Sequence, residues 1–188
     1  SGGRPVGRPR PLDQDSGGDL TVSEKLTHQD QLVDYNQRIC NKILSSQEVM
    51  ALIANDPDLD LDSPEAAQWE DHIIDHAWVD DTVQESGAFV TVDVDVTDMS
   101  SGTNKDMRVY VEVLVSKTYM ALTPSLFKGV KGNRRDNIVR QIVKLLNGSY
   151  DFGIGRLDAT NIRTVTTANK FSGKLITYMV SDFARNRS

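Results

Sequence analysis

The sequence predicts an α+β domain built around a long β-hairpin. Three observations predict it: two runs of alternating valines joined by a polar link, helix-period apolar patterns on either side of them, and a strand-like C-terminal stretch. The chain has 188 residues, the size of one ordinary domain with an extension. We expect an extended N-terminal arm over residues 1–26. Residues 27–188 should form a single domain, in which a mixed or antiparallel sheet packs against two or three helices.

The hairpin is the clearest strand signal in the chain. Valine occupies every second position in residues 89–96 and again in residues 108–115, and this alternation is typical of strands with one buried face. The link between them, residues 97–106, is polar and too long for a two-residue turn. We therefore expect an antiparallel hairpin with a long exposed tip, whose valine face is covered by the rest of the chain.

Helix signals precede the hairpin. Thr27 is a candidate N-cap for a first helix, and Ser46 is expected to cap a second segment that ends at residues 55–57, Asn-Asp-Pro. Residues 63–65, Ser-Pro-Glu, have the composition of another helix start. The apolar face of that helix would contain Trp69, Ile73, Ile74 and Ala77.

The segments after the hairpin continue the pattern. Residues 117–132 are too apolar for a free linker and predict a packed loop with a helical turn. Asn133 is the expected N-cap of the next helix, and Gly148 stands at its C′ position. Its apolar stripe should lie on the valine face and consists of Ile138, Ile142, Leu145 and Leu146. Residues 154–165 predict one strand or two short ones, and residues 171–183 a long strand.

Charge is distributed unevenly along the chain, whose net charge is −6. Residues 43–104 contain fifteen Asp or Glu and no Lys or Arg, whereas residues 105–188 contain fifteen Lys or Arg and six Asp or Glu. A solvated acidic face is one interpretation. Head-to-tail self-association, with the acidic patch of one copy on the basic patch of the next, is the other. The candidate subunit-interface residues are Arg134, Arg135, Arg140 and Lys144, on the expected outer side of the helix after the hairpin, and the acidic Asp58, Asp60, Asp62, Glu65, Asp71 and Asp75.

Two patterns bear on metal binding. Residues 56–62 alternate Asp with other residues, but Leu61 and Ala67 stand where an EF-hand requires Gly and Glu. His72 and His76 are four residues apart on the predicted helix, a spacing that binds zinc in zincins, but Ile73 replaces the general-base Glu. We expect no metal site. A small metal-dependent hydrolase using the Asp-rich segment with these histidines is the alternative from a different functional class.

Other chemistry is not indicated. The sequence contains no P-loop, no dinucleotide fingerprint, no Gly-x-Ser-x-Gly and no Cys-x-x-Cys. Cys40 is the single cysteine, which excludes a disulfide framework and predicts a small buried side chain. We therefore expect no cofactor. No apolar run is long enough to span a membrane, so a soluble protein made in a cytosol is expected.

The arm is rich in Gly and Pro and poor in apolar residues, so it cannot build a core of its own. Gly7-Arg8-Pro9 resembles the centre of an AT-hook, but Val6 stands where that motif has Arg. We expect the arm to contact a neighbouring subunit or a neck protein.

A resemblance to a known family rests on several short stretches of the sequence. They are Ile39–Leu44, the valine hairpin, Arg134-Arg135 opening a helix that ends at Leu145–Gly148, Gly153–Leu157, Phe171–Tyr178 and Asp182-Phe183. With the order of elements, they make residues 30–183 similar to the tail terminator (tail completion) proteins of tailed phages, of the kind that closes the lambda tail.

That resemblance implies an α/β fold with a sheet backed by helices, and a homohexameric ring on top of the tail tube. The implied protein is not an enzyme but a virion structural protein of the phage neck, made in the bacterial host cytoplasm. Its ring stops tube polymerisation and docks onto the head connector. Its implied partners are other copies, the tail tube protein and neck proteins, with phage DNA passing through the lumen without sequence-specific binding. Another neck ring, such as a head-closure or connector protein, is the alternative within virion assembly.

Overall fold

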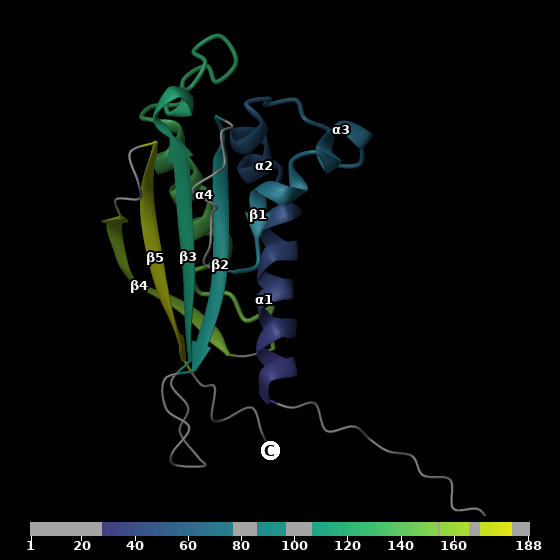
Figure 1. The fold of residues 1–188 in the computed structure, drawn as a ribbon, viewed down its shortest axis with the longest axis vertical. Helices are drawn as coiled ribbons and strands as arrows, with labels where there is room; N and C mark the ends of the chain where they lie inside the picture. Colours follow the sequence, from purple (N-terminus) through teal and green to yellow (C-terminus); the bar gives the residue numbers. More distant parts are fainter. Residues whose placement is uncertain (1–27, 77–85, 97–106, 154, 166–169, 182–188) are drawn as a thin grey trace, which may run out of the picture.

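The computed structural model describes residues 28–76, 86–96, 107–153, 155–165 and 170–181. The predicted arm, the N-cap at Thr27, the hairpin tip and the end of the last predicted strand lie outside these residues. The described part of the chain forms an α+β fold, in which one mixed sheet is packed against helices (Figure 1). The predicted fold class is therefore confirmed.

The sheet has five strands in the order β1-β2-β3-β5-β4. They are β1 (Ile73–Ile74), β2 (Ala88–Val96), β3 (Met107–Ser116), β4 (Arg156–Val165) and β5 (Phe171–Ser181). Strand β1 runs parallel to β2, and the other neighbours are antiparallel. The sequence left one strand or two open after residue 154, and the structure has the single strand β4, with a bulge between Ala159 and Asn161.

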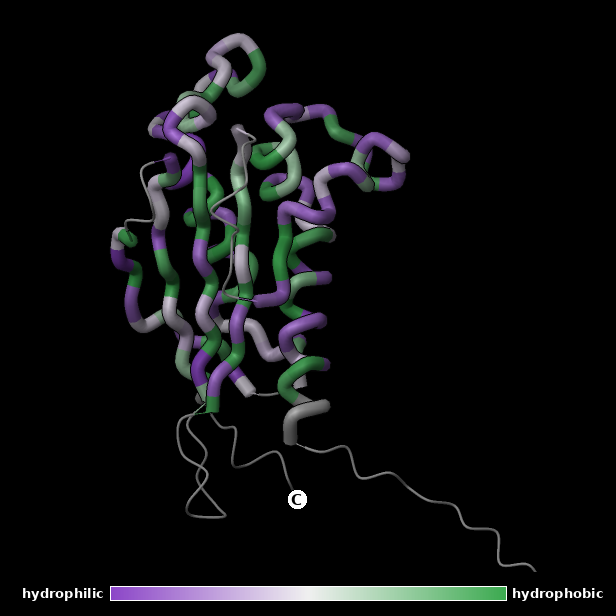
Figure 2. Tube along the Cα trace, in the orientation of Figure 1, coloured by the Kyte–Doolittle hydropathy of each residue, from purple (hydrophilic) through white to green (hydrophobic). Residues whose placement is uncertain are grey.

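The hairpin is antiparallel and has the predicted valine face. Val90 lies opposite Val113 and Val92 opposite Val111, and all four valines are fully buried. Figure 2 shows the alternation of hydrophobic and hydrophilic residues along the central strands. The prediction of a single buried face is wrong at one end of the hairpin, because Phe89, Thr91 and Leu114 on the other face are also buried.

Three helices pack on the valine face: α1 (His28–Leu44), α2 (Gln47–Ala54) and α4 (Arg134–Leu146). In Figure 1, α4 lies behind the central strands, and α1 and α2 lie on the β1 side of β2. The apolar stripe of α4 enters the core as predicted, with Ile138, Ile142 and Leu146 fully buried. No helix of the described residues has both the length and the apolar character needed to cross a membrane.

Three of the predicted helix-end residues are confirmed: Ser46, Asn133 and Gly148. The Ser46 hydroxyl accepts a hydrogen bond from the backbone N–H three residues later, at 3.4 Å, and so caps α2. Asn133 Oδ1 does the same for α4 at 2.8 Å. Gly148 has a φ of +80° just after α4, a left-handed conformation that glycine adopts without steric cost.

The predicted helix starting at residues 63–65 is much shorter than expected. Helix α3 covers only Pro64–Ala67, a single 3₁₀ turn follows at Glu70–His72, and the chain then enters β1. Ile73 and Ile74 are β-branched residues that pair with β2, and this sheet contact overrides the helical spacing of the apolar residues. Strand β1 was missed because two residues are too few to show an alternating pattern.

The segment between β3 and α4, residues 117–133, is the predicted packed loop. It begins with the 3₁₀ turn Lys117–Tyr119, and Phe127 is buried against the core. The loop projects at the end of the molecule where α3 also lies, opposite the N-terminal end of α1 (Figure 1).

Strand β4 forms one edge of the sheet. Its first half is covered, because Leu157 N–H donates to the Ser149 carbonyl at 3.0 Å and Gly148 N–H donates to the Leu157 carbonyl at 2.7 Å. Its second half is exposed, including 47% of Ile162.

One polar group in the core has no hydrogen-bond partner among the described residues, the hydroxyl of Tyr178 on β5. The Tyr178 side chain is fully buried, and this desolvation raises its pKa.

Candidate functional site

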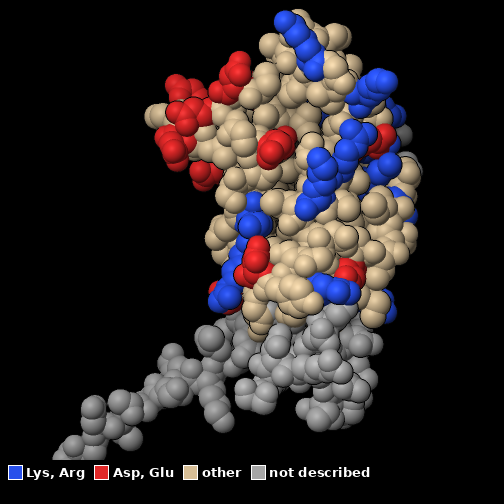
Figure 3. All heavy atoms as spheres, turned by 180° about the vertical axis from the view of Figure 1, so that it is seen from behind, with Lys and Arg blue, Asp and Glu red and all other residues tan. Residues whose placement is uncertain are grey.

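An acidic surface lies at one side of the molecule. We call it the acidic corner, and it consists of the exposed Asp56, Asp58, Asp60, Asp62, Glu65, Glu70, Asp71 and Asp75. Figure 3 shows carboxylates gathered on this side of the molecule, seen from the helix-bearing face. Within the described chain, none of the eight forms an ion pair with Lys or Arg.

Local turns hold the acidic corner in place. Asp56 and Asp60 each accept a hydrogen bond from the backbone N–H two residues later, at 3.0 and 3.1 Å, which closes two Asx turns. Leu59 between them is buried, and its carbonyl accepts a hydrogen bond from Gln47 Nε2 of α2 at 2.5 Å. The backbone is thus anchored on α2 while the carboxylates remain in solvent.

Basic residues lie on a separate area of the same face. We call this area the basic surface, and it consists of the exposed Lys128 and Lys131 of the 117–133 loop and the exposed Arg140 and Lys144 of α4. Figure 3 shows Lys and Arg side chains here, apart from the acidic corner. None of these four residues is ion-paired to a carboxylate of the described chain.

Arg134 does not belong to this surface, and the prediction that it lies on the outer side of the helix is wrong. Only 1% of Arg134 is exposed. It stands four residues before Ile138 and therefore on the buried stripe of α4. Its guanidinium donates hydrogen bonds to the carbonyls of Leu52 (2.5 Å), Tyr119 (2.8 Å) and Ala121 (3.1 Å) and to Asn55 Oδ1 (2.6 Å).

Aromatic rings complete the surroundings of Arg134. Its guanidinium carbon is 4.1 Å from the ring centroid of Tyr119 and 6.0 Å from that of Phe127. Burial lowers the pKa of Arg134, and the nearby Tyr119 acts in the opposite direction. The carbonyls at the C-terminal end of α2 carry partial negative charge, which offsets the cost of burying the cation. One side chain therefore joins α2, α4 and the 117–133 loop.

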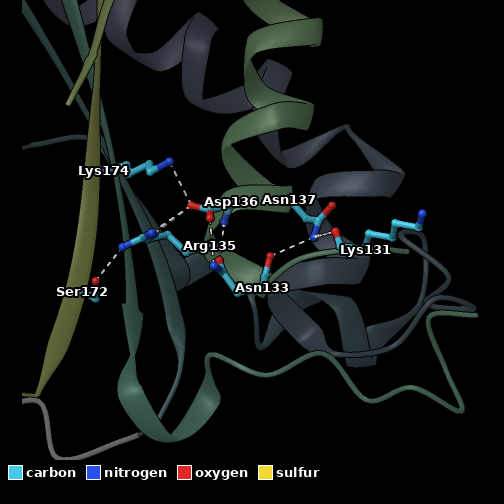
Figure 4. A network of polar contacts seen from close by, with 7 residues as sticks. All are labelled: Lys131, Asn133, Arg135, Asp136, Asn137, Ser172 and Lys174. Carbon is cyan, nitrogen blue, oxygen red and sulfur yellow. Dashed lines mark hydrogen bonds and ion pairs between the residues drawn. The ribbon is translucent and has the colours of Figure 1, made fainter. Parts of the chain in front are cut away.

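Arg135 is also engaged within its own subunit (Figure 4). Its side chain is 14% exposed and lies 3.0 Å from Asp136 Oδ1, and Arg135 Nη1 donates to Ser172 Oγ of β5 at 2.6 Å. Lys174 of β5 lies 3.1 Å from the same Asp136 oxygen. Arg135 thus ties α4 to the sheet, so its predicted place on an exposed outer side is not observed.

Asp136 is the centre of this network. Burial by itself raises the pKa of the Asp136 carboxyl, but hydrogen bonds from Lys174, Asn133 and Arg135 outweigh it and lower the pKa. The ionised carboxylate therefore links α4 to β5.

Asn137 anchors the end of the 117–133 loop. It is buried, and its Nδ2 donates to the carbonyl of Lys131 at 3.0 Å and to that of Asn133 at 2.8 Å. In Figure 4 the Lys131 side chain points away from this network. Its ammonium group is thus presented from a fixed backbone.

The two histidines do not share a helix face, contrary to the prediction. The His72 ring stacks on Phe89 with centroids 4.5 Å apart, and its Nδ1 lies 2.8 Å from the Ala88 carbonyl oxygen. His76 follows β1, and its Nδ1 lies 2.9 Å from Asp75 Oδ1. Across the described ranges, no three His, Cys, Asp or Glu residues come together in an arrangement that could hold a metal ion.

Cys40 is 3% exposed on α1, as predicted for a small core residue. Burial, with a smaller contribution from Asp75, raises the pKa of the Cys40 thiol to about 12. The thiol therefore stays protonated at neutral pH and is not an activated nucleophile.

The 117–133 loop contains an apolar pocket beside the basic surface. The pocket has a volume of about 430 Å³, and its lining includes Ala121, Leu122, Pro124, Phe127, Val130 and Asn133. Val130 at the pocket and Leu126 nearby are each 44% exposed. The sequence predicts a packed loop here. It does not distinguish the exposed Leu126 and Val130 from buried residues, because both kinds are apolar.

Comparison with known proteins gives one match. Neither the curated proteins nor the solved structures match the chain significantly. The family model YomW matches residues 36–180, which run from α1 into β5 and make up more than half of the chain. The protein therefore belongs to the YomW family, a phage-derived family, and is phage-related.

Proposed function

We propose that the protein is a structural protein of the phage neck, and that its copies form a closed, hexameric ring that terminates the tail tube and joins the tail to the head connector. Membership of a phage-derived family supports a role in a phage. The resemblance of residues 30–183 to tail terminator proteins supports the position at the end of the tail.

The main observation that supports a ring is the separation of acidic and basic surfaces on one subunit. A closed ring needs two different surfaces on each copy, because every contact joins one surface to the other surface of the next copy. The acidic corner and the basic surface are two such surfaces, and within the described chain no Lys or Arg pairs with the corner and no Asp or Glu pairs with the basic surface. Their opposite charges favour head-to-tail contact and disfavour contact between like surfaces.

Charge alone does not hold such a ring. Exposed ion pairs contribute roughly 0–1 kcal/mol each, so several pairs must act together with apolar burial. Leu126 and Val130 supply exposed apolar area next to Lys128 and Lys131. The assembly should therefore weaken at high salt, where screening acts over a Debye length of about 8 Å or less.

Two observations on purified material test the function. Negative-stain images of the protein at low salt should show rings, and the protein should be found in purified tails. Its presence in heads alone would instead favour a head-closure ring. Metal-dependent hydrolysis of phosphodiester or ester substrates by a monomer would contradict the proposal.

A further inference from the structure

The apolar pocket of the 117–133 loop is preformed. Arg134 holds the base of the loop through the carbonyls of Tyr119 and Ala121, and Tyr119 Oη donates to the Ile53 carbonyl at 3.0 Å. Thr123 Oγ1 donates to Asn55 Oδ1 at 3.2 Å. A loop fixed in this way loses little conformational entropy when a partner binds, which favours its use as a docking site.

The chemistry of the pocket specifies the kind of partner. Exposed Val130 and Leu126 provide an apolar centre, and exposed Lys128 and Lys131 provide a basic rim. No Asp or Glu occurs in residues 113–135. The pocket therefore fits a surface on which partly exposed apolar side chains lie among carboxylates.

The acidic corner has this chemistry. Pro57, Leu61 and Trp69 are partly exposed among its eight exposed carboxylates. Helix α3 of the corner and the 117–133 loop, which lines the pocket, lie at the same end of the subunit in Figure 1. Rotation about an axis along the length of the subunit keeps both at one level, so the corner of one copy can meet the pocket of the next.

We propose that the pocket of residues 121–133 on one copy is the docking site for the acidic corner, residues 56–75, of a second copy. This inference rests on the proposed ring function and identifies the surfaces that form the contact. Lys128 and Lys131 pair with carboxylates of the neighbour, and Val130 contributes to the apolar part of the contact.

A single substitution tests the apolar part. Val130→Asp places a carboxylate in a contact whose other side is acidic. It should weaken the apparent association constant at least about tenfold, the scale of a central interface residue. Ile162→Asp on the exposed half of β4 is the matched control, since Ile162 is 47% and Val130 44% exposed. The control should assemble like the wild type, and both variants should keep the wild-type circular dichroism spectrum.

A charge exchange tests the ionic part. The variant Lys128→Glu/Lys131→Glu has an acidic pocket rim as well as the acidic corner. The variant Asp58→Lys/Asp62→Lys/Glu65→Lys/Glu70→Lys/Asp71→Lys has five lysines beside three carboxylates on the corner, together with the basic rim, and it keeps the Asx-turn residues Asp56 and Asp60. Each variant alone should lose assembly, because like charges would meet at every contact. An equimolar mixture should restore rings in which the two variants alternate, as native mass spectrometry would show.

The outcomes separate the docking site from the ring itself. A wild-type protein that stays monomeric over a concentration series at low salt would contradict both. Rings that form equally well from the Val130→Asp variant, or a mixture that does not recover, would overturn the docking site and leave the ring function standing. If the lysine variant lost binding to duplex DNA but assembled normally, the basic rim would be a nucleic-acid surface and the docking site would be wrong.

Discussion

Arg134 Nη1 of α4 donates a hydrogen bond to the carbonyl oxygen of Leu52 in α2 at 2.5 Å, across 82 residues of sequence. The contact fixes the last turn of α2, from which the chain continues into the acidic corner. The same guanidinium holds the carbonyls of Tyr119 and Ala121 at the start of the pocket loop. One buried cation therefore positions both candidate assembly surfaces.

Replacing Arg134 should destabilise the subunit. Arg134→Met removes the donor from four acceptors, of which the Leu52 carbonyl is buried, so we expect the free energy of unfolding to fall by roughly 3 kcal/mol. Urea unfolding at pH 7 measures it. The control Arg140→Ala removes an exposed arginine of the same helix and should change stability by about 0.5 kcal/mol or less. Equal stability of Arg134→Met and the wild type would show that the acceptors find other partners.

Asp136 should make stability depend on pH. Its pKa is lowered in the folded protein from an ordinary value of 3.8. The stabilisation is therefore present above that value and is lost as pH falls through the lower folded-state pKa. Asp136→Asn should lower the free energy of unfolding by about 1 kcal/mol at pH 7, and the difference from the wild type should shrink below about pH 4.

Urea unfolding at a series of pH values measures this difference. Asp151→Asn is the control, because it removes an ion pair with Lys42 in which the Asp151 side chain is 62% exposed. A difference between Asp136→Asn and the wild type that stays constant down to pH 2 would contradict the role given to the Asp136 carboxylate.

Two tyrosine hydroxyls should behave differently. Tyr178→Phe removes a buried hydroxyl that has no partner among the described residues, so stability should be unchanged or higher. Tyr119→Phe removes the hydrogen bond to the Ile53 carbonyl and should cost about 1 kcal/mol. Thermal unfolding of both variants measures the contrast. A clear loss of stability in Tyr178→Phe would mean that the Tyr178 hydroxyl of the wild type does have a hydrogen-bond partner.

Charge reversal on α4 should separate assembly from folding. Arg140→Glu/Lys144→Glu alters two exposed residues and should weaken the ring without changing the melting temperature by more than about 2 °C. Arg134→Glu should instead unfold the subunit, because it buries a carboxylate against carbonyl oxygens. Light scattering and thermal unfolding report the two effects. Normal assembly of the double variant at low salt would exclude the exposed side of α4 from the contact.

Local patterns predict much of this fold. Valine alternation predicts the hairpin and its buried valine face, and the caps at Ser46 and Asn133 are single residues that precede apolar runs. Strand β1 escaped prediction because its two isoleucines also fit the helical spacing that begins at Trp69. The choice of strand comes from pairing with β2, a contact between distant residues.

The place of Arg134 was partly visible in the sequence. Its spacing of four from Ile138 puts it on the apolar stripe, although its charge favours the surface. Its burial depends on hydrogen bonds to backbone carbonyls. Every residue has a carbonyl, so no sequence pattern shows which ones will accept these hydrogen bonds. The acidic corner could be predicted as a run of carboxylates. Its separation from the basic surface could not, because this depends on how α3 and α4 are placed around the sheet.

Sedimentation velocity of the wild-type protein over a series of salt concentrations tests the charge-complementary ring most directly. We predict a single ring-sized species at low ionic strength that dissociates toward the monomer as salt screens the acidic corner from the basic surface. A monomer at every salt and protein concentration, or a ring whose population does not respond to salt, would contradict it.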